Sequence, residues 1–269
     1  MKAALLVAST PMEVPLKGVI LAGGRGTRLH PLTRITNKHL LPIYDRPMVT
    51  YAIEALVKAG VSELMLVTGG THAGEFFRLL GDGHAYGIDR LNYGYQEQEG
   101  GIAEALGLAE RFVGGERVVV MLADNVVERS LGPAVDNFRR QERGGRILLA
   151  RLDEPGHLRH LGVAELEGER VKRIVEKPAD PPSDLAVTGI YFYDEQVWGV
   201  LPTLKPSGRG ELEITDVNNW YVEQRAMEYD VLEGFWGDAG ESIDAYYEVN
   251  DFVRTNGVNK DKAWSTAPT

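Results

Sequence analysis

Short apolar runs rich in valine, isoleucine and leucine alternate along this chain with segments whose apolar residues repeat at the spacing of a helix. The clearest run, at 118–122, is apolar at every position, as expected of a parallel strand buried on both faces. Such alternation predicts strand–helix–strand units that build a mainly parallel sheet with helices on its faces. It excludes an all-helical fold and a disordered chain.

The same pattern predicts the approximate bounds of each element. Strands are expected at 18–21, 63–67, 91–95, 118–122, 147–151 and 187–193, and helices at 47–58, 75–80, 102–111, 131–141, 214–225 and 243–255. After residue 150 the pattern changes, because the apolar runs 163–166 and 171–175 flank Gly168 and predict an antiparallel hairpin. We therefore predict an α/β fold with a Rossmann-like, mainly parallel sheet flanked by helices and a small antiparallel insertion.

The chain has 269 residues and no cysteine. It therefore has no disulfide, thiolate nucleophile or Cys-ligated zinc, and a reducing cytoplasm is the expected location. No apolar run approaches the roughly 18 residues of a membrane-spanning helix, so we expect no membrane partner. We predict an N-terminal extension at 1–16, a single domain at 17–255 and a C-terminal tail at 256–269 that is frayed from Asn256.

Charge is spread unevenly along the chain. The protein has a formal net charge of -10, yet the segment from Lys17 to Arg46 has six basic residues and one acid. An acidic chain lacks the basic field that binding of a nucleic acid backbone needs, so we expect no nucleic acid partner. A local positive segment in a negative protein suits a small phosphorylated ligand.

A glycine-rich loop follows the first predicted strand, with the sequence Leu21-Ala22-Gly23-Gly24-Arg25-Gly26-Thr27-Arg28-Leu29. Glycines at the carboxyl end of a parallel strand let backbone N–H groups approach a phosphate closely, at the edge where open α/β sheets bind ligands. The loop lacks the Lys-Ser/Thr ending of a P-loop, and Leu29 stands where a dinucleotide-binding fingerprint needs glycine. Two alternatives stay open for the loop itself, a phosphate-binding loop or a tight structural turn.

Further motifs follow this loop. Pro31-Leu32-Thr33, Asn37-Lys38-His39-Leu40-Leu41-Pro42 and Arg46-Pro47-Met48 complete a set that resembles the signature of sugar-1-phosphate nucleotidyltransferases. The later motifs are Gln96 with Gly100-Gly101-Ile102-Ala103-Glu104-Ala105, Leu122-Ala123-Asp124-Asn125, Glu176-Lys177-Pro178, Ala186-Val187-Thr188-Gly189-Ile190-Tyr191, Arg209-Gly210-Glu211-Leu212-Glu213-Ile214-Thr215-Asp216 and Trp236-Gly237-Asp238-Ala239-Gly240. Together they are similar to a short form of the glucose-1-phosphate thymidylyltransferase (dTDP-glucose pyrophosphorylase) family, from about residue 17 to 251.

The resemblance implies a Mg²⁺-dependent reaction of dTTP with α-D-glucose 1-phosphate, giving dTDP-glucose and pyrophosphate. The sugar phosphate attacks the α-phosphorus in line, so the protein positions two anions and needs no covalent intermediate. The implied nucleotide-binding residues are Leu21, Ala22, Gly23, Gly24, Gly26, Thr27, Arg28, Gln96 and Gly101, the last two at the thymine base. The implied catalytic residues are Arg28, Lys38, Asp124 and Lys177, of which Arg28 and Lys38 hold the triphosphate.

The same resemblance implies a nucleotide-binding half at about 17–150 and a sugar-binding half at about 151–255. The sugar phosphate would be bound by Gly162, Glu176, Lys177, Val187 and Arg209. The implied ligands of Mg²⁺ are Asp124 and Asp238. Asp124 directly follows the buried run at 118–122, so the strand itself brings this carboxylate to the sheet edge that carries the glycine loop.

The chain departs from the family pattern at three places. Ala123 replaces the usual glycine before the metal-binding aspartate, and its methyl group is expected to crowd the nucleotide or change the sugar preference. Ala239 replaces the usual threonine after Asp238. By the resemblance we expect a short form without the C-terminal helices that give longer members a regulatory site and subunit contacts, and therefore no feedback inhibition at such a site.

Alternatives to this interpretation are the same reaction with UTP or another sugar 1-phosphate, and a catalytically silent regulatory subunit built on the same fold. His157 and His160 lack a carboxylate at ligand spacing, so we expect no metal there. By the resemblance the substrates are the partners, together with further copies of the chain in a dimer or tetramer.

Overall fold

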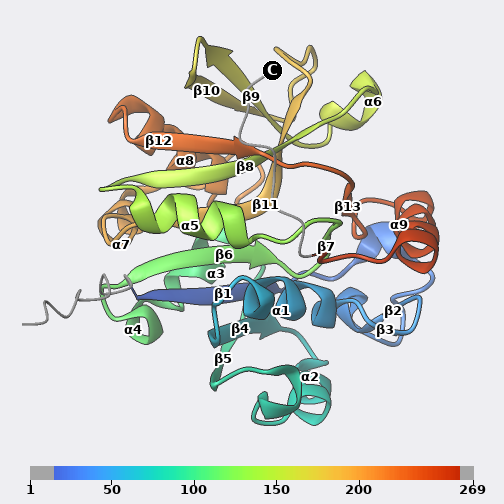
Figure 1. Ribbon diagram of the computed structural model, residues 1–269. Coiled ribbons are helices and arrows are strands. Elements are labelled where there is room, and N and C mark those ends of the chain that lie inside the picture. Colours follow the sequence, from blue (N-terminus) through green and yellow to red (C-terminus); the bar gives the residue numbers. More distant parts are fainter. Residues whose placement is uncertain (1–14, 261–269) are drawn as a thin grey trace, which may run out of the picture.

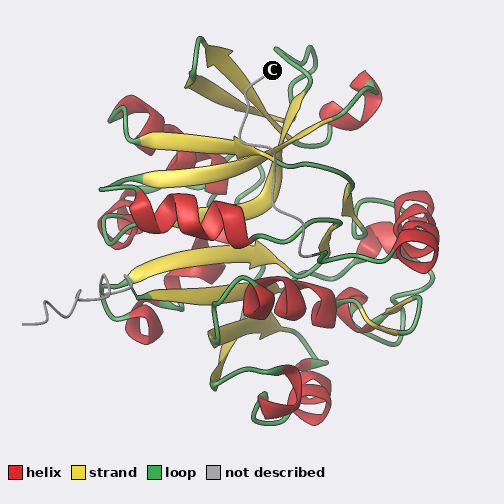
Figure 2. Ribbon diagram, viewed as in Figure 1, coloured by secondary structure: helices red, strands yellow, loops and turns green. Residues whose placement is uncertain are grey.

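In a computed structural model that describes residues 15–260, a nine-stranded sheet runs through the protein with helices against both faces (Figures 1 and 2). The strands follow the order β10-β9-β11-β6-β1-β4-β5, and β8 and β12 branch from β11. This arrangement is a Rossmann-like α/β fold. The predicted fold class is confirmed.

The first half of the chain contains the parallel part of the sheet. Its strands are β1 (Leu16–Ala22), β4 (Glu63–Gly69), β5 (Arg90–Gln96) and β6 (Arg117–Leu122). The chain passes from β1 to β4 and β5 on one side and then returns to β6 on the other, with Val19 between Met65 and Val120. The strand order therefore reverses at β1, and ligands of open α/β sheets bind at the carboxyl ends of such strands.

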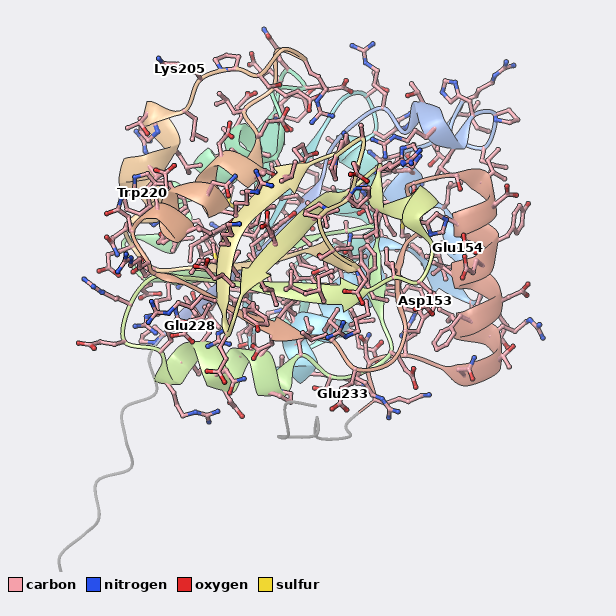
Figure 3. The ribbon with its side chains drawn as sticks, turned by 90° about the horizontal axis from the view of Figure 1, so that it is seen from above. Asp153, Glu154, Lys205, Trp220, Glu228 and Glu233 are labelled. Atoms are coloured by element: carbon pink, nitrogen blue, oxygen red, sulfur yellow. The ribbon has the colours of Figure 1, made fainter. Side chains whose placement is uncertain are left out.

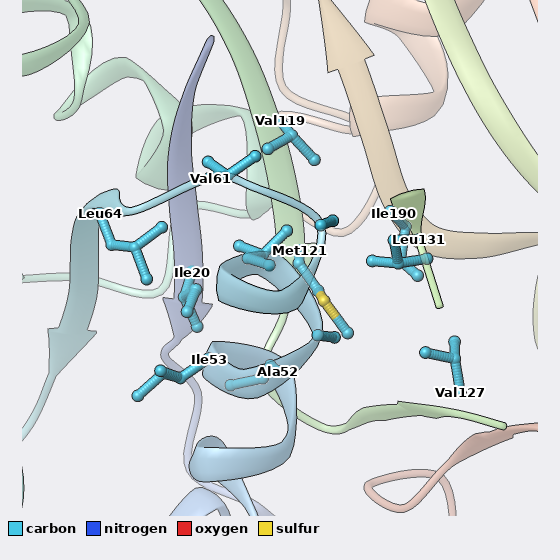
Figure 4. Packing of buried hydrophobic residues seen from close by; sticks show 14 of the residues in the cluster. Ile20, Ala52, Ile53, Val61, Leu64, Val119, Met121, Val127, Leu131 and Ile190 are labelled. Carbon is cyan, nitrogen blue, oxygen red and sulfur yellow. The ribbon is translucent and has the colours of Figure 1, made fainter. Parts of the chain in front are cut away.

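Helices cover both faces of this sheet. One face holds α1 (Val49–Lys58), α2 (Ala73–Leu80) and α5 (Gly132–Arg140), and the other holds α3 (Ile102–Gly107), α4 (Glu110–Val113), α7 (Val197–Val200) and α8 (Ile214–Glu223). On the first face Ala52 and Ile53 of α1 pack against the sheet cluster that includes Ile20 and Met121 (Figure 4). Burial of these apolar faces fixes the sheet edge on which the site is built.

The second half of the chain adds antiparallel strands. They are β8 (Gly145–Arg151), β9 (Gly162–Glu167), β10 (Arg170–Glu176) and β11 (Leu185–Tyr193). Strand β11 runs antiparallel to both β6 and β8, and β9 with β10 forms the predicted hairpin. The pattern did not reveal β12 (Met227–Val231), which pairs in parallel with β8.

Smaller elements complete the fold. They are β2 (Pro42–Ile43), β3 (Arg46–Pro47), β7 (Asn125–Val127), β13 (Trp236–Asp238), α6 (Pro155–Leu158), α9 (Ile243–Asn256), η1 (Thr27–Leu29), η2 (Lys38–Leu40), η3 (His84–Tyr86) and η4 (Leu201–Thr203). The antiparallel pair β7–β13 ties the end of the domain to the segment after β6. No helix within residues 15–260 is long and apolar enough to cross a membrane.

Two local predictions are wrong. The helix expected at 102–111 is broken into α3 and α4, since the chain leaves the α-helical pattern at Leu108 and Ala109. The tail is also not frayed over residues 256–260, because buried Asn259 donates its side-chain amide to Glu54 at 3.1 Å and its backbone N–H to Val127 at 3.1 Å. Residues 1–14 and 261–269, and with them most of the predicted extension and tail, lie outside the described residues.

Candidate active site

A cleft of about 340 Å³ opens at the carboxyl ends of the parallel strands and continues to β9, β10 and β11. Nearly all predicted site residues line it, namely Leu21, Gly23, Gly24, Arg28, Lys38, Gln96, Gly101, Asp124, Gly162, Glu176, Lys177, Val187, Arg209 and Asp238. Ala22, Gly26 and Thr27 are not among its lining residues, and Ala22 is buried in the core. The fold therefore brings the residues of both halves into one cavity.

The glycine loop after β1 has a conformation that favours glycine. Gly24 and Gly26 have φ angles of 91° and 62°, in the region that side chains rarely adopt. A Cβ on Gly23 would lie 3.1 Å from Gln96 Oε1, and the Gly26 carbonyl accepts a hydrogen bond of 2.7 Å from the Thr33 hydroxyl. The loop therefore runs close to Gln96 while Arg28 stays exposed at the cleft.

Buried Asp124 and the partly buried Lys38 and Asp238 meet in the cleft, and we call this group the buried centre. Lys38 Nζ donates to Asp124 Oδ2 at 2.5 Å, and these side chains are only 17% and 8% exposed. Asp238 ends β13 and lies opposite Asn125, so the β7–β13 pair brings it beside Asp124. The Ala239 N–H donates to the Asp124 carbonyl at 2.9 Å and fixes this approach.

These three charges shift one another's pKa values. Burial, aided by the Asp124 carboxylate, raises the pKa of Asp238 to about 7. Burial alone would also raise the pKa of Asp124, but the Lys38 ammonium holds that pKa well below its usual range. Burial opposes the charge of Lys38, yet the two carboxylates keep its pKa above the ordinary value. The centre is therefore an ion pair beside a carboxylate that takes up a proton readily.

The donor set at this centre suits a divalent cation. Mg²⁺ in phosphate-binding sites commonly takes one or two carboxylates together with substrate oxygens. Repulsion from Asp124 contributes to the raised pKa of Asp238, and a cation between the two carboxylates would relieve it. Within residues 15–260 no group of three or more His, Asp or Glu side chains is arranged to hold a metal, so substrate oxygens would have to complete the coordination.

Gly240 leaves room for this centre. A Cβ at this position would meet the Asp124 carboxylate and lie 2.7 Å from Lys38 Nζ. The Gly240 N–H also donates to Asp238 Oδ1 at 2.8 Å. The glycine therefore leaves space for Asp124 and donates a hydrogen bond to Asp238. The sequence motif did not reveal this role, because the need for a residue without a side chain is set by Lys38 and Asp124, which lie far away in the chain.

The predicted base-binding residues Gln96 and Gly101 lie at the last position of β5 and directly before α3. Gln96 is buried, and its side-chain amide donates to the Gly101 carbonyl at 3.3 Å. Gly101 has a φ of 100°, and a Cβ there would lie 2.5 Å from the Leu212 carbonyl. Glycine is therefore required at 101 by the close approach of the Leu212 backbone, a reason that the sequence could not supply.

Three of the predicted sugar-binding residues, Gly162, Glu176 and Val187, come from the neighbouring strands β9, β10 and β11. Glu176 pairs with Gly162 in the register of the two strands, and Val187 lies next to Gly162. Glu176 Oε2 accepts a hydrogen bond of 2.6 Å from the hydroxyl of Thr215, which lies on α8. Lys177 has a φ of 44°, a strained conformation of the kind that concentrates at functional sites.

Residues 17–256 match the family model described as nucleotidyl transferase. This chain belongs to that family. It is 39% identical over 244 residues to the glucose-1-phosphate thymidylyltransferase of Neisseria meningitidis. The aligned segment covers 89% of this chain and 83% of the relative. This nucleotidyl transferase is therefore an enzyme, as predicted.

Two solved structures resemble the fold closely. The first is a candidate glucose-1-phosphate thymidylyltransferase from Bacillus anthracis with bound sucrose, which is 42% identical with a TM-score of 0.85 and covers 92% of this chain and 98% of its own. The second is a UDP-glucose pyrophosphorylase in complex with UDP-glucose, which is 26% identical with a TM-score of 0.76. The match covers 88% of this chain and 98% of the pyrophosphorylase. The similarity extends over both halves of the cleft.

The departures from the family pattern have local explanations in this nucleotidyl transferase. Ala123 is fully buried in the core cluster and is not among the cleft-lining residues. The expectation that its methyl group crowds the cleft is therefore wrong. Ala239 is also buried, in an apolar cluster with Tyr246 of α9. Both alanines therefore face the core rather than the cleft.

Sequence analysis missed several cleft residues. Asn125 links β13 and β11 at the cleft, because its Oδ1 accepts hydrogen bonds from Trp236 Nε1 at 2.7 Å and from the Gly189 N–H at 2.9 Å. Thr215 orients Glu176, as described above, and His160, which was considered only as a metal ligand, also lines the cleft. Asn125, Trp236, Gly189 and Thr215 all lie inside the quoted motifs, so the motifs held the only signal that could have found them.

Proposed function

We propose that this nucleotidyl transferase transfers dTMP from dTTP to α-D-glucose 1-phosphate, with Mg²⁺ as cofactor, and releases pyrophosphate. One observation carries the proposal. The buried centre of Lys38, Asp124 and Asp238 and the sugar-side residues Glu176 and Lys177 line a single cleft. A nucleotide and a sugar phosphate bound in that cleft would be held side by side, as an in-line transfer requires.

Arg28 and Lys38 would bind the triphosphate beside the glycine loop. Both side chains line the cleft, and each would stabilise charge that develops on the leaving pyrophosphate. Lys38 already binds Asp124, so it must exchange part of this contact for phosphate oxygens when the nucleotide enters. Asp124 and Asp238 would hold the Mg²⁺, which supplies charge neutralisation at the phosphates.

The sugar side would bind the second substrate. Lys177 would contact the phosphate of glucose 1-phosphate together with Arg209, and Glu176 would accept hydrogen bonds from sugar hydroxyls. Gly162 and Val187 would pack against the ring. Because the reaction needs only positioning and charge stabilisation, no nucleophilic side chain is required.

UTP is the main alternative nucleotide. Gln96 offers an amide to an edge that thymine and uracil share, and one methyl group is worth only about 1 to 3 kcal/mol of discrimination. The likeness to a UDP-glucose pyrophosphorylase favours keeping this alternative. A silent regulatory subunit has less support, because Arg28, Lys38, Asp124, Lys177 and Asp238 all line the cleft.

The proposal is tested by measuring pyrophosphate release with Mg²⁺ and α-D-glucose 1-phosphate, with dTTP, UTP, CTP, ATP and GTP side by side. We expect the fastest release with dTTP and none after Mg²⁺ is removed by a chelator. Faster release with UTP would keep the reaction and change the substrate. No release with any nucleotide and any of a panel of sugar 1-phosphates would favour the silent subunit.

A further inference from the structure

Arg209 is held by the acidic residue that precedes α8. Glu213 forms a two-point ion pair with it, in which Arg209 Nε donates to Oε1 at 3.2 Å and Nη2 donates to Oε2 at 2.8 Å. Ser207 links the two residues a second time, because its hydroxyl donates to Glu213 Oε1 at 2.7 Å and accepts from the Arg209 backbone N–H at 3.2 Å. The long arginine side chain therefore has one defined orientation.

Glu213 is better placed for this role than its neighbour Glu211. The Glu213 side chain is 14% exposed, whereas that of Glu211 is 40% exposed and its carboxylate lies 3.9 Å from Arg209 Nη2, beyond hydrogen-bond distance. Glu213 also stands at the N-terminus of α8, two residues before the Thr215 that binds Glu176. A well-packed helix thus supports the carboxylate.

The geometry of the pair leaves part of the guanidinium free. A planar guanidinium has five N–H donors in a fixed fork, and the pair with Glu213 uses the edge formed by Nε and Nη2. The Nη1 group and the second hydrogen of Nη2 stay available to an anion. Arg209 lines the cleft, and its Nη2 lies 3.6 Å from Glu176 Oε1, so the free edge belongs to the sugar side.

The segment that carries the pair is also fixed at its base. The Leu212 N–H donates to the Gly100 carbonyl at 2.8 Å, and the Ala103 N–H donates to the Leu212 carbonyl at 3.2 Å. The segment starts near Lys205 and leads into the helix that bears Trp220, and both residues lie on the same side of the molecule in Figure 3. The Arg209 side chain is 42% exposed, and within this fixed segment its ion pair with Glu213 restrains it.

We propose that Glu213 is a positioning residue, which holds the Arg209 guanidinium with its free edge toward the phosphate of the sugar 1-phosphate. This inference rests on the proposed function, since it assumes that a sugar phosphate binds beside Glu176 and Lys177. Pre-organising a flexible cation lowers the entropy that binding must otherwise overcome. The alternative is that Glu213 only neutralises the charge of Arg209. In that case, removal of the Glu213 carboxylate should strengthen phosphate binding.

The test compares Glu213→Ala and Glu213→Gln with the matched control Glu211→Gln, which removes the same charge from the same segment. We expect Glu213→Ala to raise the KM for glucose 1-phosphate roughly tenfold and leave the KM for dTTP unchanged. Glu213→Gln keeps one acceptor and should fall in between, and Glu211→Gln should change either KM by less than about twofold. An unchanged or lowered KM for glucose 1-phosphate in both Glu213 variants would overturn the proposal.

A double-mutant cycle separates positioning from a structural role. In an Arg209→Ala background, the further change Glu213→Ala should add less than about twofold, because the group that it positions is gone. A full effect in that background would mean that Glu213 acts through α8, and would overturn the proposal. Thermal melting of each variant checks that the fold is retained.

The two proposals fail in different ways. If the wild-type protein releases pyrophosphate from dTTP and glucose 1-phosphate but the Glu213 variants behave like Glu211→Gln, only the positioning role is wrong. If the wild-type protein shows no release with any nucleotide, the proposed function is wrong and the positioning role falls with it.

Discussion

The two ends of the cleft hold their charges in different ways. We name each end after the substrate proposed for it. At the nucleotide end, Lys38 and Asp124 are nearly buried and bind each other directly. At the sugar end, Glu176 and Lys177 are each 32% exposed, and their charged atoms lie 3.7 Å apart. Charges interact far more strongly away from water, so the first end is a rigid electrostatic centre and the second is an adjustable one. Changes at the buried end should therefore have the larger effects.

The largest effect is expected from Asp124→Asn. It removes the carboxylate that pairs with Lys38 and is proposed to bind Mg²⁺, so kcat should fall by about 10³-fold or more. Steady-state pyrophosphate release measures the loss, with the exposed Asp251→Asn as control. Circular dichroism should show a folded protein. An unchanged rate would show that Asp124 does not bind the metal. It would also contradict the expectation that substitutions at the buried end have the larger effects on activity.

The second prediction concerns pH and sharpens the description of the buried centre. Because the pKa of Asp238 is raised from 3.8 to about 7, the folded protein binds more protons than the unfolded chain between these values. The free energy of unfolding should therefore fall as the pH rises from about 4 to 7, by up to about 4 kcal/mol from this group. Asp238→Asn should remove this contribution.

Urea unfolding of both proteins in the presence of a chelator, at several pH values from 4 to 8, measures the difference. The contribution of Asp124 has the opposite sign, since its lowered pKa stabilises the fold above about pH 4 and this stabilisation is lost on acidification. Parallel curves for wild type and Asp238→Asn would contradict the raised pKa.

Gly240→Ala tests how little space the buried centre leaves. The new methyl group would meet the Asp124 carboxylate and lie 2.7 Å from Lys38 Nζ. Displacing these groups should lower kcat roughly 100-fold, since small errors in position are costly in transfer reactions. Gly199→Ala is the control, because a Cβ there meets nothing within 4 Å. Equal activity of both variants would show that the centre adapts as easily as the sugar end.

The smallest of these effects is expected from Lys177→Ala at the sugar end. Loss of one half-exposed cation should raise the KM for glucose 1-phosphate roughly tenfold and leave that for dTTP unchanged. Lys172→Ala is the control, because Lys172 lies on β10, the strand that ends just before Lys177, and is paired with Glu165. A loss confined to dTTP would show that the assignment of the two ends is wrong.

The sequence predicted where the elements of the nucleotide end lie, because its parts are local. The run 118–122, the glycine loop and Asp124 each reveal their place through burial pattern and strand order. Strand β12 was missed because the expected strands were placed on continuous apolar runs, whereas its residues alternate between apolar and charged, as is typical of a half-buried strand at the edge of a sheet. Hairpin β9–β10 was predicted because two apolar runs flank a glycine.

Contacts between distant segments were beyond such reasoning. The need for glycine at 240 depends on Lys38 and Asp124, and that at 101 depends on the backbone of Leu212. Nor does any local pattern show that Glu213, rather than Glu211, holds Arg209. The motifs signalled that these positions matter, and the folded structure supplies the physical reasons.

The pairing of β7 with β13 has a consequence for synthesis on the ribosome. Asp124 emerges with the first half of the chain, but its partner Asp238 and the Asn259 that ties residues 257–260 to α1 come near the end. A nascent chain that already has the glycine loop and most of the sheet still lacks half of the buried acidic centre. The two carboxylates proposed to bind the cation can therefore come together only after the chain has been synthesised at least as far as Asp238.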